Sequence, residues 1–134
     1  MAKESGLGMT VAVDDDGGTP RTISNDIRSI NFGTPRGVQD VTGLDKSAIE
    51  RLLLHADGTV TINGVFNDAA DMSHDVFKTV PSTSVARTVT ITISGQVLAM
   101  ELLFNDYAIA RPASGELTFT ASGQLANGAV PTWA

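Results

Sequence analysis

The residue types of a hydrolytic triad stand side by side at Ser73, His74 and Asp75. A catalytic relay needs its three side chains to hydrogen-bond in series. Consecutive residues of a helix point in directions about 100° apart, so three neighbours cannot converge in this way. The only other histidine, His55, is far from His74 in sequence, and the pair lacks the spacing of metal ligands. Each histidine is therefore interpreted as a surface residue or as one whose hydrogen bonds are satisfied within the fold.

Metal and cofactor chemistry has no better support in the sequence. Asp14 and Asp16 have the spacing that opens a calcium loop, but Gly18 stands where a third oxygen ligand is needed and the late glutamate is missing. A solvated turn is the preferred interpretation. The chain has no cysteine, and Gly6 and Gly8 are not followed by the lysine and helix of a phosphate-binding loop. We expect no catalytic residue, no cofactor and no metal site.

Length and charge limit the remaining classes of protein. The 134 residues predict a single domain, 1–134, with a modest core, in which residues 1–6 form a flexible arm and residues 127–134 a tail. No stretch approaches the ~20 apolar residues of a membrane helix. The net charge is −6, and the nine Lys and Arg residues are scattered. Nucleic-acid binding depends on clustered positive charge, so adhesive binding to DNA or RNA is not expected.

A strand over Arg87–Ser94 has the clearest pattern in the chain. Val89, Ile91 and Ile93 fall on one face, and hydroxyl side chains fall on the other. Thr59–Phe66 and Glu116–Leu125 repeat this alternation, and a weaker form of it occurs in residues 7–13. The hydroxyl faces are interpreted as solvated surfaces or as contact surfaces of an assembly.

Other segments complete the set of expected elements. Residues 71–80 predict a helix that Ser73 caps and Pro81 ends. Residues 97–104 predict a strand covered on both faces, followed by a turn at Asn105–Asp106. A change of apolar phase within residues 21–32 predicts a bulge or a switch of sheet. Many short strands and one helix indicate a mainly β fold, a β-sandwich or barrel-like domain with a flanking α-helix.

Residues 45–55 are compatible with two structures. Ile49, Leu52 and Leu53 fit one face of a helix that Asp45 could cap. The alternative is a strand that runs into a hairpin turn at residues 56–58.

The order of segments between Ile23 and Trp133 resembles the tail tube, or major tail, proteins of long-tailed bacteriophages. The resemblance lies in the ordered set rather than in one motif. The segments that carry it are Asp40–Ala48, Glu50–Leu54, Asp57–Asn67, Ser73–Pro81, Arg87–Gly95, Asp106–Tyr107, Gly115–Thr118 and Pro131–Trp133.

This resemblance implies a structural, non-enzymatic protein of the virion tail, made in the cytoplasm of a host bacterium. Six subunits would form a ring whose inner wall is a continuous β-barrel. Stacked rings would form the tube through which DNA passes without specific binding, and the partners would include the tape measure and tail terminator proteins. A related tail-completion protein or secretion-system tube subunit is the alternative, as is a monomeric β-sandwich binding module. Such a module usually carries an aromatic platform, whereas aromatic residues make up 5% of this chain.

Two sets of residues are candidates for roles in such a tube. Trp133 is a large apolar group on the C-terminal tail, and we expect it to be an assembly contact. A channel for DNA should repel phosphate, so at least one acidic side chain is expected to face the lumen. The lumen candidates are Asp57, Asp68, Asp106 and Glu116.

Overall fold

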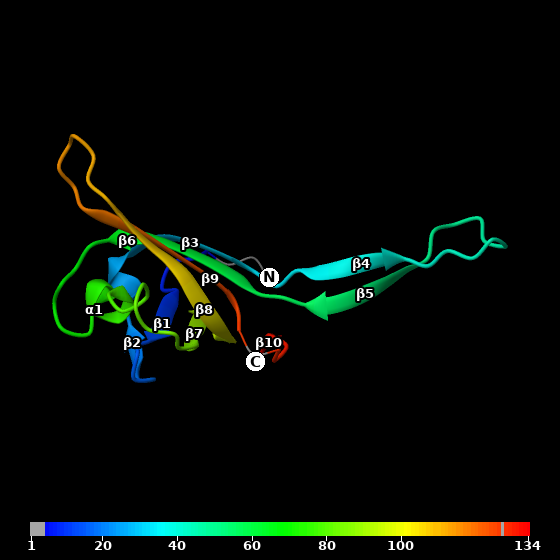
Figure 1. Cartoon of the computed structure of the whole chain (residues 1–134), viewed down its shortest axis with the longest axis horizontal. Coiled ribbons are helices and arrows are strands. Elements are labelled where there is room, and N and C mark those ends of the chain that lie inside the picture. The colour runs from blue at the N-terminus through cyan, green and yellow to red at the C-terminus, as the bar shows by residue number, and fades with distance from the viewer. Residues whose placement is uncertain (1–4, 127) are drawn as a thin grey trace.

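The regular structure among the described residues is almost entirely antiparallel strands, with one short α-helix (Figure 1). The computed structural model describes residues 5–126 and 128–134, so most of the expected N-terminal arm and the first residue of the expected tail lie outside the described residues. The prediction of a mainly β, sandwich-type fold with one helix is confirmed. In chain order the elements are β1 (Thr10–Asp14), β2 (Pro20–Thr22), the 3-10 turn η1 (Ser24–Asp26), β3 (Ile27–Gly33), β4 (Arg36–Asp40), β5 (Arg51–Ala56), β6 (Thr59–Val65), α1 (Ser73–Phe77), β7 (Arg87–Ile93), β8 (Gln96–Ala110), β9 (Thr118–Leu125) and β10 (Thr132–Trp133).

Strand β8 connects the two layers of the fold. The strands follow one another in the order β2-β1-β7-β8-β9-β6-β3, and β10 also pairs with β8. The first part of β8, up to Leu102, pairs with β7, whereas the part from Leu102 to Ala110 pairs with β9. The register shifts between Phe104 and Asp106, where a bulge bends the strand. We call β3, β6, β9 and the second part of β8 the four-strand layer, and β2, β1, β7, the first part of β8 and β10 the five-strand layer.

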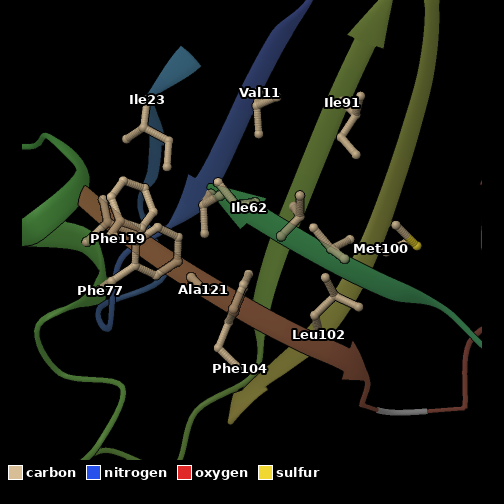
Figure 2. Close-up of a cluster of buried hydrophobic side chains, with 14 of the residues drawn as sticks. Val11, Ile23, Ile62, Phe77, Ile91, Met100, Leu102, Phe104, Phe119 and Ala121 are labelled. Atoms are coloured by element: carbon tan, nitrogen blue, oxygen red, sulfur yellow. The ribbon is translucent and has the colours of Figure 1, made fainter. Parts of the chain in front are cut away.

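The core lies between these two layers (Figure 2). Alternate residues of each strand point inward, so Ile91 of β7 and Ile62 of β6 both point into the core (Figure 2). Both are fully buried, as are Val89 and Val60 two residues away on the same strands. The helix closes one end of the core, because the ring of Phe77 packs 5.2 to 5.7 Å from the rings of three aromatic residues. These are Phe104, Tyr107 and Phe119.

Helix α1 is shorter than predicted, and its predicted cap is wrong. Residues 78–82 form turns, and the N-cap position belongs to Met72, whose side chain makes no capping hydrogen bond. The Ser73 hydroxyl donates to the Val65 carbonyl at 3.1 Å instead. The Ser73 N–H donates to the buried carboxylate of Asp26 at 3.0 Å, and this carboxylate also accepts from the Asn67 amide at 3.0 Å. A carboxylate distant in sequence thus replaces the local cap.

Strand β8 also departs from its prediction. The turn expected at Asn105–Asp106 does not form, because the strand continues through it for fifteen residues in all. Leu103 points away from the core and is 48% exposed, so the described part of the chain covers only one face of this apolar segment. The turn after β7 lies at Ser94–Gly95, where both residues have positive φ, as tight hairpin turns require.

In the segment from residue 21 to residue 58, the predicted irregularity and a strand are present, whereas a predicted hairpin is not. The expected irregularity is a bulge in β3 between Ile27 and Ser29. Residues 51–56 form strand β5 and residues 45–50 lie in the loop before it, so the helical alternative is wrong and the strand alternative is correct for the second half of the region. The predicted hairpin at residues 56–58 is wrong, because β5 pairs with β4, whereas β6 pairs with β3 and β9.

Arg87 is a buried cation that ties the five-strand layer to the helix region. Its side chain is 1% exposed and comes from β7, the strand with the clearest pattern in the sequence. The guanidinium donates to the carbonyls of Val76 at 2.7 Å and Asp14 at 3.2 Å, and to the Thr79 hydroxyl at 2.8 Å. Burial lowers the pKa of Arg87, and the nearby aspartates 14 to 16 act against that shift. An arginine remains charged in proteins, so this site depends on its three acceptors.

Substituting Arg87→Met should destabilise the fold by about 3 kcal/mol, because three acceptors lose their donor in a buried place. Arg28→Met, at an exposed position, is the matched control and should change stability by no more than ~0.5 kcal/mol. Denaturant unfolding of both variants measures the difference. Equal stabilities would show that Arg87 does not hold the helix region against the five-strand layer.

Candidate functional site

The three residues with triad chemistry each have a different partner. The Ser73 hydroxyl donates a hydrogen bond to the Val65 carbonyl, and the His74 ring is hydrogen-bonded to the Tyr107 hydroxyl. The Asp75 carboxylate forms an ion pair with Lys78 at 2.7 Å. In the turn that contains Asp14 and Asp16, the Asp15 carboxylate accepts hydrogen bonds from backbone N–H groups and forms an ion pair with the Arg21 side chain. These contacts give all of these polar groups structural roles. Within residues 5–126 and 128–134, no group of three or more His, Asp or Glu side chains is placed to hold a metal ion. The same part of the chain has no helix of the length and apolarity needed to span a bilayer.

His74 and Tyr107 form a small polar cluster at the aromatic end of the core. Nδ1 of His74 and the Tyr107 hydroxyl are hydrogen-bonded at 3.1 Å, and the His74 ring lies 4.5 Å from that of Phe66. The Tyr107 ring also packs against Phe77 and Phe119. Burial raises the pKa of Tyr107 from its ordinary 10.0 to about 12. The cluster joins α1 to β8.

This pKa shift makes stability depend on alkaline pH. In the unfolded chain Tyr107 ionises near pH 10.0, while in the folded protein it stays protonated up to about pH 12. Its contribution to stability is thus complete below pH 10.0 and is lost as the pH rises towards 12. Tyr107 is the only tyrosine, so phenolate absorbance reports on it alone. We expect Tyr107→Phe to remove this loss of stability at alkaline pH. Phenolate formation near pH 10.0 in the folded protein would contradict the raised pKa of Tyr107.

A two-stranded arm, formed by residues 36–56, projects from the four-strand layer (Figure 1). Strands β3 and β6 pair up to Gly33 and Thr59, and the ladder resumes in the arm with Arg36 opposite Ala56. Between the two ladders, the Asp57 N–H donates to the Pro35 carbonyl at 2.9 Å. The arm is therefore the continuation of one long hairpin beyond the sandwich.

The arm exposes apolar side chains on both of its faces. Val38 and Leu53 lie opposite one another and are 55% and 60% exposed, and the next pair along, Gln39 and Leu52, points to the other face with Leu52 57% exposed. A two-stranded hairpin is marginally stable in water by itself. Large exposed apolar patches in soluble proteins mark interaction sites. The large apolar residues that are exposed in the arm and its loop are Val38, Val41, Leu44, Ile49, Leu52, Leu53 and Leu54.

The four-strand layer has two unpaired edges among the described residues. Strand β3 ends the order of paired strands, and the part of β8 beyond Phe104 pairs on one side only, with β9. Strand β3 has seven residues, so its unpaired edge presents a row of backbone donors and acceptors. Such edges can add a strand from another chain.

The four acidic candidates lie in separate places, and all are exposed. Asp57 is at the root of the arm, where its carboxylate accepts from the Gly58 N–H. Asp68 lies in the loop between β6 and α1, and Glu116 in the loop between β8 and β9. Asp106 is the one within a strand, opposite Ser122 of β9.

Trp133 is held by a short strand yet remains half exposed. Trp133 pairs with Leu98 of β8, and its ring lies 6.2 Å from that of Phe32. The side chain is 50% exposed, so it has apolar surface available for another molecule. The sequence directed attention to Trp133 but not to the arm. The signal for the arm was the run Leu52–Leu54, which is apolar on successive positions of a strand and therefore on both faces.

Comparisons with known proteins show a shared fold. No family model and no curated protein matches this chain. Its structure is similar to that of a chain in the virion of the native gene transfer agent particle, with a TM-score of 0.78 and 16% identity over 98% of this chain and 99% of the other. It is also similar to a chain in the tail of the empty particle, described with C6 symmetry, with a TM-score of 0.77 and 17% identity over 98% and 99%. At such identities the likeness shows the fold alone.

Proposed function

We propose that this chain is a structural subunit of a phage-like tail tube, in which six copies form a ring and the rings stack. The observation that carries this proposal is the arm, because a two-stranded ribbon with leucines on both faces requires cover that the described chain does not supply. The similarity in fold to a chain of a tail with C6 symmetry supports the proposal independently. No step of this function requires a catalytic residue or a cofactor.

The four-strand layer is suited to close a ring. Its strands alternate in direction, so with four strands the unpaired edge of β8 runs antiparallel to the unpaired edge of β3 in a neighbouring copy of the same orientation. Repeating this head-to-tail contact around an axis closes a β-barrel. The five-strand layer lacks this property. Its odd number of strands would bring parallel edges together, and its end strands, β2 and β10, have three and two residues.

The arm is suited to join one ring to the next. It projects far beyond the sandwich, and its strands β4 and β5 continue the β3–β6 hairpin of the four-strand layer (Figure 1). Apolar side chains on both faces call for cover on both faces, so each arm would lie between two surfaces of neighbouring copies. In such a tube the other tail proteins, a tape measure and a tail terminator, would contact the inner wall and the last ring. DNA would pass through the lumen without specific binding.

Other roles predict different assemblies. A tail-completion protein or a secretion-system tube subunit would use the same edges and arm but a different number of rings or a different cargo. In a monomeric binding module the arm would stay in water, and exposure of its leucine side chains to water is unfavourable. The tail tube is favoured because the edges offer a contact that closes a ring and the arm offers a contact that repeats from one ring to the next along the axis.

The double variant Leu53→Asp with Leu54→Asp should abolish tube formation and leave the subunit folded. Both side chains are exposed, so thermal stability should change little, whereas charges in a buried contact between rings carry a large desolvation cost. Sedimentation and negative-stain microscopy measure assembly. The control, Thr22→Asp with Asn25→Asp, adds the same charge at exposed positions outside the arm and should assemble. Normal tubes from the arm variant would refute this role of the arm.

Substituting Trp133→Ala should weaken tube formation while the subunit stays folded. Half of the side chain is exposed, and aromatic residues at interfaces often carry much of the binding energy. The free energy of unfolding should fall by no more than about 1 kcal/mol, because the backbone pairing of β10 with β8 is kept. Trp133→Phe retains a ring and should assemble. A large drop in melting temperature with unchanged tube yield would instead place Trp133 in the core of its own subunit.

A further inference from the structure

The outward face of the four-strand layer carries almost no charge. The pairing registers define which side chains point away from the core on all four strands. The outward residues are Ser29, Asn31 and Gly33 of β3; Thr59, Thr61, Asn63 and Val65 of β6; Thr118, Thr120, Ser122 and Gln124 of β9; and Leu103, Asp106, Ala108 and Ala110 of β8. Asp106 is the only ionisable residue among these outward register positions, and no lysine or arginine occurs there.

Hydroxyl and amide groups dominate the face and hydrogen-bond along it. The Thr120 hydroxyl of β9 donates to the Asn63 side-chain carbonyl of β6 at 2.7 Å. Basic side chains occur at the borders of the layer, and Arg36 begins the arm beyond Gly33. Arg28 sits at the bulge of the β3 edge, where it lines a hollow with Met9 and Val11, and Arg111 belongs to the loop between β8 and β9. The face therefore offers a polyanion no cation at the outward positions of its strands.

We propose that this face is the wall of the channel and that Asp106 forms its one ring of acidic side chains. The inference rests on the proposed tube, because closing the ring through β3 and β8 places this layer in a continuous barrel with one face towards the axis. Binding to nucleic acid requires cations that displace counterions from phosphate. A wall of hydroxyl and amide groups with a single acidic ring would give duplex DNA no site at which to stop. Of the four acidic candidates, Asp57, Asp68 and Glu116 lie in connecting segments outside this set of strand positions.

Cysteine labelling of assembled tubes tests which face is inside. The chain has no native cysteine, so one introduced thiol is the only target. Asn31→Cys and Gln124→Cys place it on the proposed wall, and Thr10→Cys places it on the outward face of the five-strand layer; all three positions are exposed in the subunit. A maleimide on a polymer too large to enter the tube should label every free subunit. In tubes we expect labelling to be lost at the two wall positions and kept at Thr10.

The outcomes separate this inference from the proposed function. If no variant and no unmodified chain forms tubes, the tube itself is wrong and the wall with it. If tubes form but the wall positions react as fast as Thr10, the tube stands and the assignment of the wall is overturned.

A charge reversal tests the role of Asp106. Tubes assembled with short duplex DNA should not protect it from nuclease when they carry Asp106 or Asp106→Asn. Asp106→Lys would place a ring of cations inside, and these tubes should protect DNA at low salt and release it as salt rises. Thr10→Lys, on the other layer, should hold DNA only in a form that nuclease digests. Protected DNA in Thr10→Lys tubes, or none in Asp106→Lys tubes, would overturn the assignment.

Discussion

The bend in strand β8 is the constraint on which the rest of the structure depends. One strand supplies a partner to β7 and then to β9, so the two layers cannot move apart without breaking a continuous ladder. The bend needs room on the neighbouring strand, and Gly123 provides it: a Cβ there would lie 3.0 Å from the Leu103 carbonyl oxygen. Because β8 turns away from β7 at this point, its second part keeps one edge unpaired among the described residues. The bend thus places the two layers on opposite sides of the core. It also leaves one edge of β8 unpaired, and we propose that this edge closes the ring.

Fold and assembly use different parts of this chain. Stability comes from the side chains between the layers and from buried polar groups such as Arg87 and Asp26, each with its hydrogen bonds made. The proposed contacts between copies use the arm, the edges of β3 and β8, and Trp133, where exposed side chains and unpaired backbone groups lie outside this core. This separation suits a subunit that must fold before it polymerises. Because the fold is stabilised elsewhere, it does not require charged side chains on the outward face of the four-strand layer.

The sequence predicted the strands of the core well and the rest less well, for physical reasons. Alternation in β7 reports burial on one face, and this burial occurs within the chain. The same apolar signal in Leu52–Leu54 cannot show whether cover comes from the chain's own core or from another copy. Arg87 and Asp26 were missed because their partners are distant in sequence, and local pattern carries no trace of them. The continuation of β8 through Asn105–Asp106 was missed because a bulge and a turn use similar residues.

A three-dimensional image reconstruction of the assembled protein tests the central claim most directly. Our account requires six copies in each ring, β3 of one copy paired antiparallel with β8 of the next, and each arm enclosed by subunits of the adjacent ring. It also requires Asp106 to point towards the axis. Rings closed through the five-strand layer, arms left in solvent, or a chain that stays monomeric at high concentration would each contradict it.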